Sequence, residues 1–382
     1  MKIGITCYPT YGGSGVVATE LGIELAQRGH EIHFISYSQP IRLVEFHPNI
    51  HFHEVNVSQY PLFEYPPYDL ALATRMAEVA EMYSLDLLHV HYAIPHSVSA
   101  LLAKQMLAAA RNGAQKKLPF ATTLHGTDIT LVGLDRSYLP ITRFSIEQSD
   151  GVTAISNYLR DRTLREFDVK NEINVIYNFV NCDIYNRNSK DAENRSNYAA
   201  ANERILVHLS NFRPVKRIPD VIEVFDRVQK VIPSRLLMIG DGPERSRAEI
   251  MAKRRGIKDR VIFLGKQDQV QTKLAISDLM LMPSELESFG LAALEAMACK
   301  VPSIATNVGG IPELIEHGKN GYLAEVGDVE TMSKYAIELL SNDARLKEMG
   351  ESARWEAQSR FCSTKIISQY EAFYARVLER SR

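Results

Sequence analysis

The chain has 382 residues, of which 45% are hydrophobic and 24% are charged, and its formal net charge is −2. A chain of this length is longer than one domain with a single hydrophobic core usually is, so two domains are predicted. The composition is typical of a soluble globular protein. The near-neutral charge argues against nucleic acid or an anionic membrane as a partner, and no apolar run reaches the length of a membrane span.

Strand and helix patterns alternate along the first half of the chain. Lys2–Cys7 predicts a buried strand, the glycine-rich segment Tyr11–Gly15 a turn, and Val16–Arg28 a helix that ends at Gly29 in a left-handed cap. Further strands are expected at Glu31–Ser36, Leu85–His91, Phe120–Leu124 and Gly151–Ile155. Such alternation predicts a parallel sheet with helices on both faces.

A second series of strands follows the Asn-rich stretch Asn181–Glu203. Its strands are expected at Arg204–Leu209, Arg235–Ile239, Arg260–Leu264, Asp278–Met282 and Val301–Ala305. We therefore predict two doubly wound α/β domains, residues 1–180 and residues 181–364, that face each other across a cleft. The last segment, Lys365–Arg382, has an aromatic helical face and a polar side of mixed charge, so we expect it to pack back onto the first domain rather than onto a membrane.

A glycine-rich segment separates the first strand from the first helix. Open parallel sheets bind ligands beyond the carboxyl ends of their strands, so functional residues are expected in such loops. Small residues at Gly12–Gly15 let a ligand approach the backbone, and the helix start attracts an anion. The spacing is not that of the dinucleotide fingerprint. A plain tight turn and a phosphate contact through Gly13 and Ser14 both stay open.

The segment Ser210–Arg217 directly follows the first strand of the second domain. Arg213 and Lys216 can both reach a ligand there, and two cations would stabilise the charge that develops on a diphosphate leaving group. The alternative is a solvated basic turn before a helix. The position at the carboxyl end of a strand favours the functional interpretation.

The strongest signal lies in Pro283–Ala298. Glu287 falls in the loop after a strand and can accept hydrogen bonds from sugar hydroxyls, whereas Glu295 falls inside the next helix and can bind both hydroxyls of a ribose. The apolar neighbours of Glu295 leave little solvent for a carboxylate without a role. Glu285 is expected to stay solvated. The helix start offers backbone N–H groups to a phosphate, at Phe289, Gly290 and Leu291.

Two glutamates separated by seven residues, in the context S-F-G-L…E-A-M-A, resemble the signature of the family-4 retaining glycosyltransferases, which have the GT-B fold. The upstream R-P-V-K-R and the glycine-rich first turn match as well, so the resemblance covers essentially the whole chain. In that family the two glutamates hold the donor sugar and its ribose, while the Arg and the Lys hold the diphosphate. The resemblance thus implies a UDP-sugar donor bound by Glu287, Glu295, Arg213 and Lys216.

Four segments of the first half look like those of family members with a particular acceptor. They are Tyr8–Gly15, Tyr65–Leu70, His91–His96 and Leu124–Thr130. These relatives move N-acetylglucosamine from UDP-N-acetylglucosamine to the 2-hydroxyl of L-malate, the first step of bacillithiol biosynthesis. The resemblance therefore implies that the first domain binds L-malate.

Malate is a small dianion, so its pocket requires cations or hydrogen-bond donors. We expect Arg143 to bind it, since related inositol-phosphate enzymes place an Arg there; the alternative is a surface helix cation. Tyr92 and Thr127 are expected as hydroxyl donors, and Ser14 as a bridge between acceptor and diphosphate.

His125 ends a buried strand, which favours a position facing the sugar. In relatives the equivalent histidine bonds the 6-hydroxyl of the donor, so His125 is grouped with Glu287, Arg213 and Lys216 as catalytic. Asp128 is expected either to orient this loop or to cap the following helix.

The run His47, His51 and His53 invites interpretation as a metal site. His51 and His53 share a strand face, but no acidic fourth ligand is evident, so we favour surface histidines. No D-x-D segment stands in a convincing loop, and cationic residues with a helix terminus are expected to replace a magnesium ion. We therefore expect no cofactor and no metal.

The cysteines and the first residues of the sequence indicate the cellular compartment. The four cysteines form no C-x-x-C pair, which is typical of free thiols in a reducing cytosol. The first residues begin a strand and lack the apolar region of a signal peptide, so a cytoplasmic protein is expected. A homo-oligomer stays open.

The expected reaction is same-face transfer with retention, in which the departing β-phosphate oxygen accepts the proton of the acceptor hydroxyl. A double displacement through a carboxylate is the alternative. Three other functions remain in view: a glycosyltransferase with a sugar or lipid-linked acceptor, an isomerase resembling UDP-N-acetylglucosamine 2-epimerase, and a non-catalytic nucleotide-sugar binder.

Overall fold

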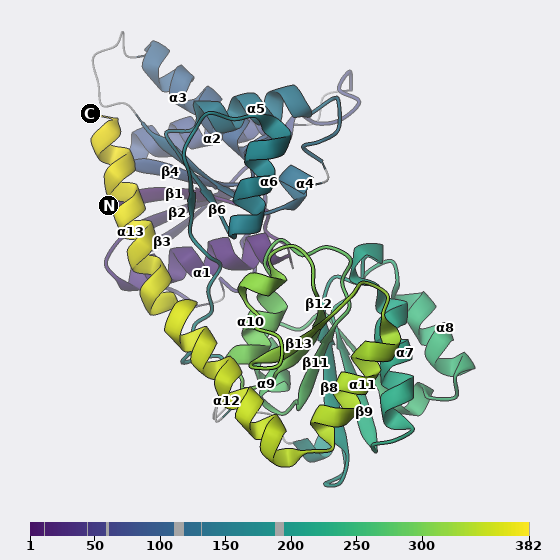
Figure 1. The fold of residues 1–382 in the computed structure, drawn as a ribbon. Coiled ribbons are helices and arrows are strands. Elements are labelled where there is room, and N and C mark those ends of the chain that lie inside the picture. The colour runs from purple at the N-terminus through teal and green to yellow at the C-terminus, as the bar shows by residue number, and fades with distance from the viewer. Residues whose placement is uncertain are drawn as a thin grey trace. The chain divides into compact units, whose positions relative to one another are not determined.

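The computed structural model describes residues 1–10, 12–43, 45–58, 61–110, 118–130, 132–187 and 195–381. Tyr11 and Arg382, which belong to the expected turn and last helix, lie outside these ranges, as do residues 188–194. The chain divides into two compact units, which we call unit 1 (Met1–Tyr177 with Ile366–Arg382) and unit 2 (Asn178–Lys365). Each unit is a sheet flanked by helices (Figure 1).

Unit 1 contains a parallel sheet of seven strands among its described residues, in the order β3-β2-β1-β4-β5-β6-β7. The order reverses between β1 and β4, so their carboxyl ends form the switch point at which such sheets bind ligands. The strands are β1 (Lys2–Thr6), β2 (Glu31–Ser36), β3 (Ile50–Glu54), β4 (Leu87–His91), β5 (Phe120–Leu124), β6 (Gly151–Ala154) and β7 (Ile173–Val175).

The first helix of unit 1 begins earlier than expected. Gly13 starts α1, so the predicted glycine turn supplies the first turn of the helix instead. Gly15 is required there because a Cβ atom would lie 2.4 Å from the Tyr8 carbonyl oxygen. Gly29, at φ +88°, adopts the left-handed conformation expected after the helix. The helices of unit 1 are α1 (Gly13–Gln27), α2 (Tyr68–Tyr83), η1 (Ala93–Ser97), α3 (Val98–Ala110), α4 (Thr127–Thr130), α5 (Leu139–Gln148), α6 (Asn157–Phe167) and most of α13 (Ser363–Arg380).

The last helix, α13, leaves unit 2 and packs onto unit 1. The Tyr374 hydroxyl lies 2.8 Å from His89 Nδ1 on β4, and Glu371 pairs with Arg28 at 2.9 Å. Full burial of an apolar side chain contributes about 2 kcal/mol, so this face fixes the helix on the sheet. The buried side chains of the face are Ile366, Ile367, Tyr370, Phe373, Tyr374 and Val377.

Unit 2 contains a parallel sheet of six strands among its described residues, in the order β10-β9-β8-β11-β12-β13. Its order reverses between β8 and β11, which gives unit 2 a switch point of its own. The strands are β8 (Arg204–Leu209), β9 (Ser234–Ile239), β10 (Val261–Gly265), β11 (Leu279–Met282), β12 (Ser303–Thr306) and β13 (Gly321–Ala324).

Helices cover both faces of the unit 2 sheet: α9 and α10 lie on one side, and α7, α8 and α11 on the other (Figure 1). The longer helices are α7 (Ile218–Gln229), α8 (Arg245–Arg254), α9 (Val270–Ala275), α10 (Leu291–Ala298), α11 (Val329–Leu340) and α12 (Asp343–Arg360). Short helical turns occur at η2 (Arg195–Asn197), η3 (Pro214–Lys216), η4 (Lys258–Arg260) and η5 (Ile311–Glu313).

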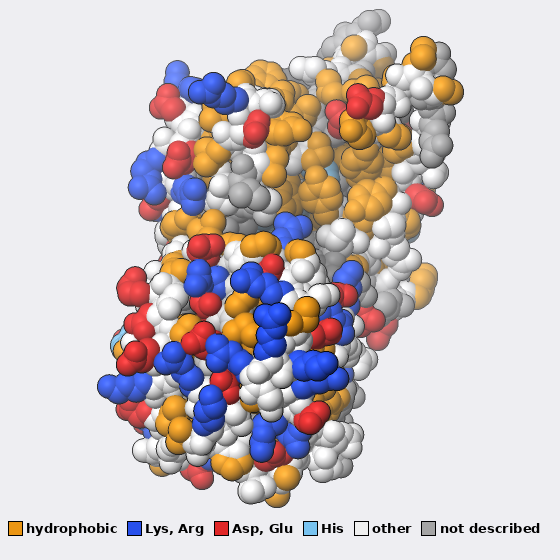
Figure 2. Space-filling view, turned by 90° about the vertical axis from the view of Figure 1, so that its right-hand side faces the viewer, with side chains coloured by type: hydrophobic (Ala, Val, Ile, Leu, Met, Phe, Trp, Pro, Cys, Tyr) orange, Lys and Arg blue, Asp and Glu red, His pale blue; other side chains and the backbone are white. Residues whose placement is uncertain are grey.

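The surface of unit 2 carries charges of both signs. Figure 2 shows Lys and Arg side chains interspersed with Asp and Glu on the face that includes α8. Many are paired: Arg245 contacts Glu249 at 3.0 Å, and Arg255 contacts the buried Asp226 at 2.9 Å. This face therefore presents no field of a single sign. None of the described helices is long and apolar enough to cross a membrane.

Candidate active site

A charged pair stands at the switch point of unit 2. Lys216 ends η3, the turn after β8, and Glu287 lies in the loop after the neighbouring strand β11. Lys216 Nζ is 2.6 Å from Glu287 Oε1, and the two side chains are only 20% and 12% exposed. The backbone N–H of Glu285 donates to the Val215 carbonyl at 2.8 Å and joins the two segments. The sequence placed both residues in one site, and the structure brings them together.

Glycines hold the loops of this edge against one another. A Cβ atom on Gly309, after β12, would lie 1.8 Å from the Glu287 carbonyl oxygen, and the Gly310 N–H donates to that same oxygen at 2.9 Å. On the other side, a Cβ atom on Gly240, after β9, would lie 1.8 Å from the Ser210 carbonyl oxygen. The backbone that carries Glu287 is therefore fixed by contacts that only glycine permits.

The two arginines of the expected diphosphate segment differ in their contacts. The Arg213 side chain is exposed and forms no hydrogen bond or ion pair with any residue that the structure describes. Arg217, in contrast, binds Asp220 at 2.6 Å and approaches Glu285, which is 58% exposed as expected, at 3.8 Å. Arg213 is thus the cation of this turn that is available to an anionic ligand.

At the start of α10, only main-chain N–H groups are placed to make the expected phosphate contact. Gly290, at φ +100°, precedes the helix, and Leu291 is its first residue. The first N–H groups of a helix have no partner within the helix and can bind an anion. The Phe289 side chain is buried against Phe361, with ring centroids 5.6 Å apart. Phe289 can therefore meet a ligand only through its main chain.

Glu295 has a partner that the sequence did not reveal. Its carboxylate is 5% exposed and accepts a hydrogen bond from the Tyr185 hydroxyl at 2.8 Å. Arg354 fixes the same segment by donating to the carbonyl oxygens of Tyr185 and Cys182. Glu295 belongs to a buried network in unit 2, and its binding to a ribose stays a prediction.

A cluster of buried histidines lies at the switch-point edge of unit 1. His91 Nδ1, at the end of β4, is 2.8 Å from His125 Nε2, just beyond β5, and His96 Nδ1 is 2.6 Å from the His91 carbonyl oxygen. Burial lowers the pKa of His89 and His125 to about 3 and that of His96 to about 4. These imidazoles are therefore uncharged at neutral pH.

The bonding pattern assigns the protons of this pair. His91 Nε2 is buried and has no partner among the described residues. A buried N–H without an acceptor costs more than an unfilled lone pair, so His91 carries its proton on Nδ1 and donates to His125. His125 then holds its own proton on Nδ1. The neutral His125 can donate that proton in a hydrogen bond to a ligand hydroxyl.

Asp128 orients the loop that carries His125. Its carboxylate is 1% exposed and accepts from the backbone N–H groups of Ala93 at 3.0 Å, His125 at 3.2 Å and Gly126 at 2.8 Å. Burial raises the pKa of Asp128, and these hydrogen bonds act in the opposite direction. Of the two expected roles, loop orientation is confirmed.

Three of the expected ligand-binding residues lie in contact in unit 1. The Ser14 hydroxyl, in the first turn of α1, donates to the Tyr92 hydroxyl at 3.2 Å. The Tyr92 ring stacks on His125 with centroids 5.6 Å apart. Tyr92 holds φ at +96°, a strained conformation for a residue with a side chain and one that often marks functional sites. Gly13, the first residue of α1, adjoins this group.

Thr127 and Arg143 occupy different positions. Thr127 is exposed and begins α4 two residues after His125. Arg143 lies on α5, where Nε approaches Glu147 and Nη2 approaches Asp168, each at 3.4 Å. Its side chain is 38% exposed, and no contact joins it to the other expected residues within the described chain. Binding of the acceptor by Arg143 stays a prediction.

The histidine run His47–His53 does not act as a unit. His51 and His53 lie on β3, while His47 precedes the strand and accepts from the Asn49 N–H. The pairing of β2 with β3 places Glu31 and His33 of β2 beside His51 of β3. An acidic residue does lie beside His51, since Glu31 of the neighbouring strand approaches it at 4.0 Å, but it groups with His33 and His51 rather than with the run of three. The expectation of surface histidines is wrong for His53, which is buried.

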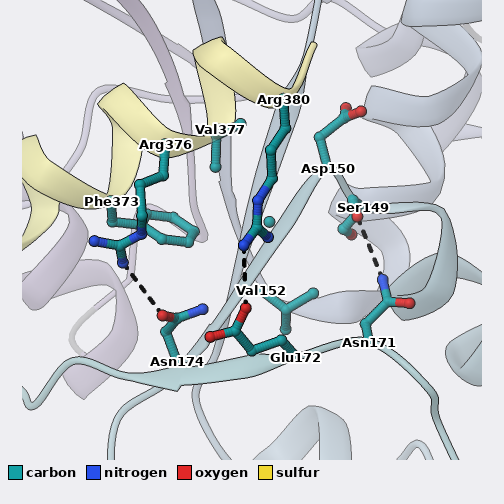
Figure 3. A pocket seen from close by; sticks show the side chains of 11 residues that line it. Ser149, Asp150, Val152, Asn171, Glu172, Asn174, Phe373, Arg376, Val377 and Arg380 are labelled. Atoms are coloured by element: carbon teal, nitrogen blue, oxygen red, sulfur yellow. Dashed lines mark hydrogen bonds and ion pairs between the residues drawn. The ribbon is translucent and has the colours of Figure 1, made fainter.

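A pocket of unit 1 lies away from the switch-point edge (Figure 3). It is lined by the amino ends of β6 and β7 and by α13. Its arginines are engaged, since Arg380 contacts Glu172 at 3.3 Å and Arg376 donates to Asn174 at 3.2 Å. Parallel sheets bind ligands at the other end of their strands, so the pocket is not the candidate site.

Comparison with known proteins gives the same division of the chain. The model for "Glycosyltransferase Family 4" matches residues 11–184, and the model for "Glycosyl transferases group 1" matches residues 189–355. A sucrose-phosphate synthase from Thermosynechococcus elongatus has a TM-score of 0.78 at 22% identity, with 99% of each chain covered. The Anabaena protein HepE, solved with UDP and glucose, has a TM-score of 0.81 at 20% identity over 98% of this chain and 99% of its own.

One curated relative is much more similar. The N-acetyl-alpha-D-glucosaminyl L-malate synthase of Bacillus anthracis is 52% identical over 378 residues, which cover 99% of this chain and 97% of the relative. The predicted fold, two parallel-sheet α/β domains of the GT-B type, is confirmed by the neighbouring structures and by the family models. The chain is a glycosyltransferase and belongs to glycosyltransferase family 4.

Proposed function

We propose that this enzyme transfers N-acetylglucosamine from UDP-N-acetylglucosamine to the 2-hydroxyl of L-malate with retention, as the first step of bacillithiol biosynthesis. The observation that carries the proposal is the 52% identity with the L-malate synthase of Bacillus anthracis. Because the similarity covers 99% of the chain, it includes the switch-point residues of both units. The four free cysteines agree with a cytosolic location.

In this proposal the donor is bound by unit 2. Arg213 and Lys216 hold the diphosphate together with the first N–H groups of α10, Glu287 binds the sugar hydroxyls, and Glu295 binds the ribose. The Lys216 ammonium has three N–H donors, so it can bind a phosphate oxygen while it keeps its contact with Glu287. Fixed cations stabilise the charge of the leaving diphosphate, so transfer is expected without a metal ion.

The acceptor is bound by unit 1. Arg143 pairs with a malate carboxylate, and Ser14, Tyr92 and Thr127 supply hydroxyl groups, whereas the Nδ1–H of His125 binds a hydroxyl of the donor sugar. The bond between the anomeric carbon and the UDP oxygen breaks as the bond to the malate oxygen forms on the same face. The departing β-phosphate oxygen accepts the malate proton.

A double displacement would need a free carboxylate as nucleophile. The carboxylate of Asp128 accepts three backbone hydrogen bonds and is buried, which supports direct transfer over attack by this residue. Covalent trapping of a glycosylated Asp or Glu on the protein would favour the double displacement instead.

The test mixes purified protein, UDP-N-acetylglucosamine and L-malate in EDTA and follows UDP release, with the anomeric configuration of the product measured by NMR. We expect malate-dependent UDP release and an α-linked product. A β-linked product would contradict the proposal. A new sugar nucleotide from the donor alone would support an epimerase, UDP release with only other acceptors would change the acceptor, and donor binding without UDP release would indicate a binding protein.

A further inference from the structure

A second group of polar side chains lies at the amino end of the unit 1 strands. Glu31 is the first residue of β2 and His33 the third, so the two side chains point to the same face of the sheet. The parallel register places His51 of β3 directly beside His33. Two strands thus bring one carboxylate and two imidazoles to one face, at the opposite end of the sheet from His125.

The distances within this group approach those of a metal site. Glu31 Oε1 is 3.0 Å from His33 Nε2 and 4.0 Å from His51 Nε2, and all three ligand atoms lie within 4.8 Å of one another. Ligands of a tetrahedral zinc ion, at about 2.0–2.2 Å from the metal, are roughly 3.4 Å apart. The His51 side chain is 40% exposed and can move the remaining distance, whereas His33 is fully buried and fixed.

The surroundings fix the central imidazole. His33 Nδ1 lies 2.9 Å from His53 Nε2, the kind of second hydrogen bond that orients a ligating histidine. The Tyr83 ring, at the end of α2, packs on His33 with centroids 4.6 Å apart. Lys2 contacts Glu31 Oε2 at 3.2 Å and leaves Oε1 facing the imidazoles.

We propose that Glu31, His33 and His51 together bind one divalent transition-metal ion such as Zn²⁺. Two imidazoles and a carboxylate suit this class of ion better than Mg²⁺ or Ca²⁺, which prefer oxygen ligands. The ion takes the place of the hydrogen bond between His33 Nε2 and Glu31 Oε1. The single ring proton of His33 then lies on Nδ1 and donates to His53 Nε2, so the imidazole stays neutral and its Nε2 lone pair binds the ion. Water completes the coordination from the exposed side of His51.

This ion would join the edge strand β3 to β2 and would not take part in glycosyl transfer. It lies at the amino end of the strands, whereas the switch-point residues follow their carboxyl ends. Binding of the ion is therefore expected to raise the thermal stability of the protein and to leave donor binding unchanged.

The test titrates the full chain, freed of metal and carrying no polyhistidine tag, with Zn²⁺ by calorimetry and with Co²⁺ by visible absorption. One equivalent per chain is expected, with a rise in Tm. His51→Ala and Glu31→Gln should each weaken binding on the order of tenfold or more, while the matched control His47→Ala should bind as the wild type does.

Because His51 is exposed and Glu31→Gln preserves shape, both variants should keep the metal-free Tm of the wild type. Absence of stoichiometric binding would overturn the proposal, as would equal affinity in the wild type and these two variants. Equal loss in His47→Ala would also overturn it, since the ion would then bind the histidine run of the sequence. Each readout is independent of transferase activity.

Discussion

Lys216 and Glu287 are mostly buried and form an ion pair at 2.6 Å, so removal of either charge alters the electrostatics at the switch point of unit 2. We predict that Lys216→Met lowers kcat/KM for transfer by about 10²–10³-fold, because it removes the cation that we propose to stabilise the leaving diphosphate. Steady-state UDP release measures this loss. Lys258→Met, at an exposed position of η4, should behave as wild type; an equal loss there would contradict the specific role.

Arg143 tests the acceptor side of the proposal. A charge-assisted hydrogen bond is worth about 1.5–3 kcal/mol, and the exposure of Arg143 places it near the lower value. Arg143→Ala should therefore raise the KM for malate about tenfold and leave the Kd for UDP unchanged. Arg165→Ala, on α6, is the control for loss of a surface cation. An unchanged KM in Arg143→Ala would mean that the arginine serves only Glu147 and Asp168.

Individual site residues could be predicted where a charged side chain directly follows a predicted buried strand. Lys216 and Glu287 each follow a buried strand, so their meeting could be expected from their positions in the sequence. Tyr185 could not be found this way, because its bond to Glu295 joins residues far apart in the chain and no local pattern marks it. His208 was also missed; it is buried at the end of β8 and bonds the Leu281 carbonyl and the Ser210 hydroxyl.

At the scale of elements, glycine contacts hold the loops of unit 2 in place. Gly309 and Gly318 both adopt positive φ, at +57° and +77°, but only at Gly309 would a Cβ atom meet backbone, at Glu287. Gly318→Ala should cost about 1 kcal/mol from the strained φ alone. Gly309→Ala should cost more and should also weaken UDP binding, since the loop that carries Glu287 must shift.

Urea unfolding and UDP titration of the two glycine variants measure both effects. Equal stability losses with unchanged UDP binding in both variants would show that the contact at Glu287 does not position the loop.

Strands were predicted best where apolar and β-branched residues are concentrated in a short segment. Glu31–Ser36, Phe120–Leu124 and Arg204–Leu209 have the expected bounds because each is a short, mostly buried segment rich in apolar and β-branched residues. The start of α1 was predicted too late because glycines are poor helix formers. Their place in the first turn of the helix depends on the close contact of Gly15 with the preceding loop, which the sequence does not show. The strand β7 was not predicted, because its three residues are too few to show the alternation of apolar and polar residues that marks a strand.

For the whole molecule, the two units should respond differently to acid. Unit 1 buries imidazoles with pKa values of about 3 to 4, at His53, His89, His96 and His125, and unit 2 contributes His208 at about 4. Each folded-state pKa lies below the unfolded value of about 6.5, so the unfolded chain binds more protons between these values. The stability of unit 1 should therefore be constant above about pH 6.5 and fall as the pH drops toward 4.

Each such histidine contributes up to about 1.4 kcal/mol per pH unit, so the loss in unit 1 should exceed that in unit 2. Urea unfolding at pH 7.5 and 5.0 can separate the units, because the single tryptophan, Trp355, lies on α12 of unit 2. The transition by far-UV circular dichroism should shift to lower urea more than the Trp355 fluorescence transition does. Equal shifts would contradict the prediction.

The course of the chain through α13 has a consequence for synthesis on the ribosome. When residues 1–177 have been made, the sheet of unit 1 is complete, but the helix that covers His89 is still to come. At 5–20 residues per second, the intervening unit takes roughly 10–40 s to translate. Unit 2 is continuous in sequence and can fold in that interval. The core of unit 1 is thus closed only by a helix that is translated after the whole of unit 2.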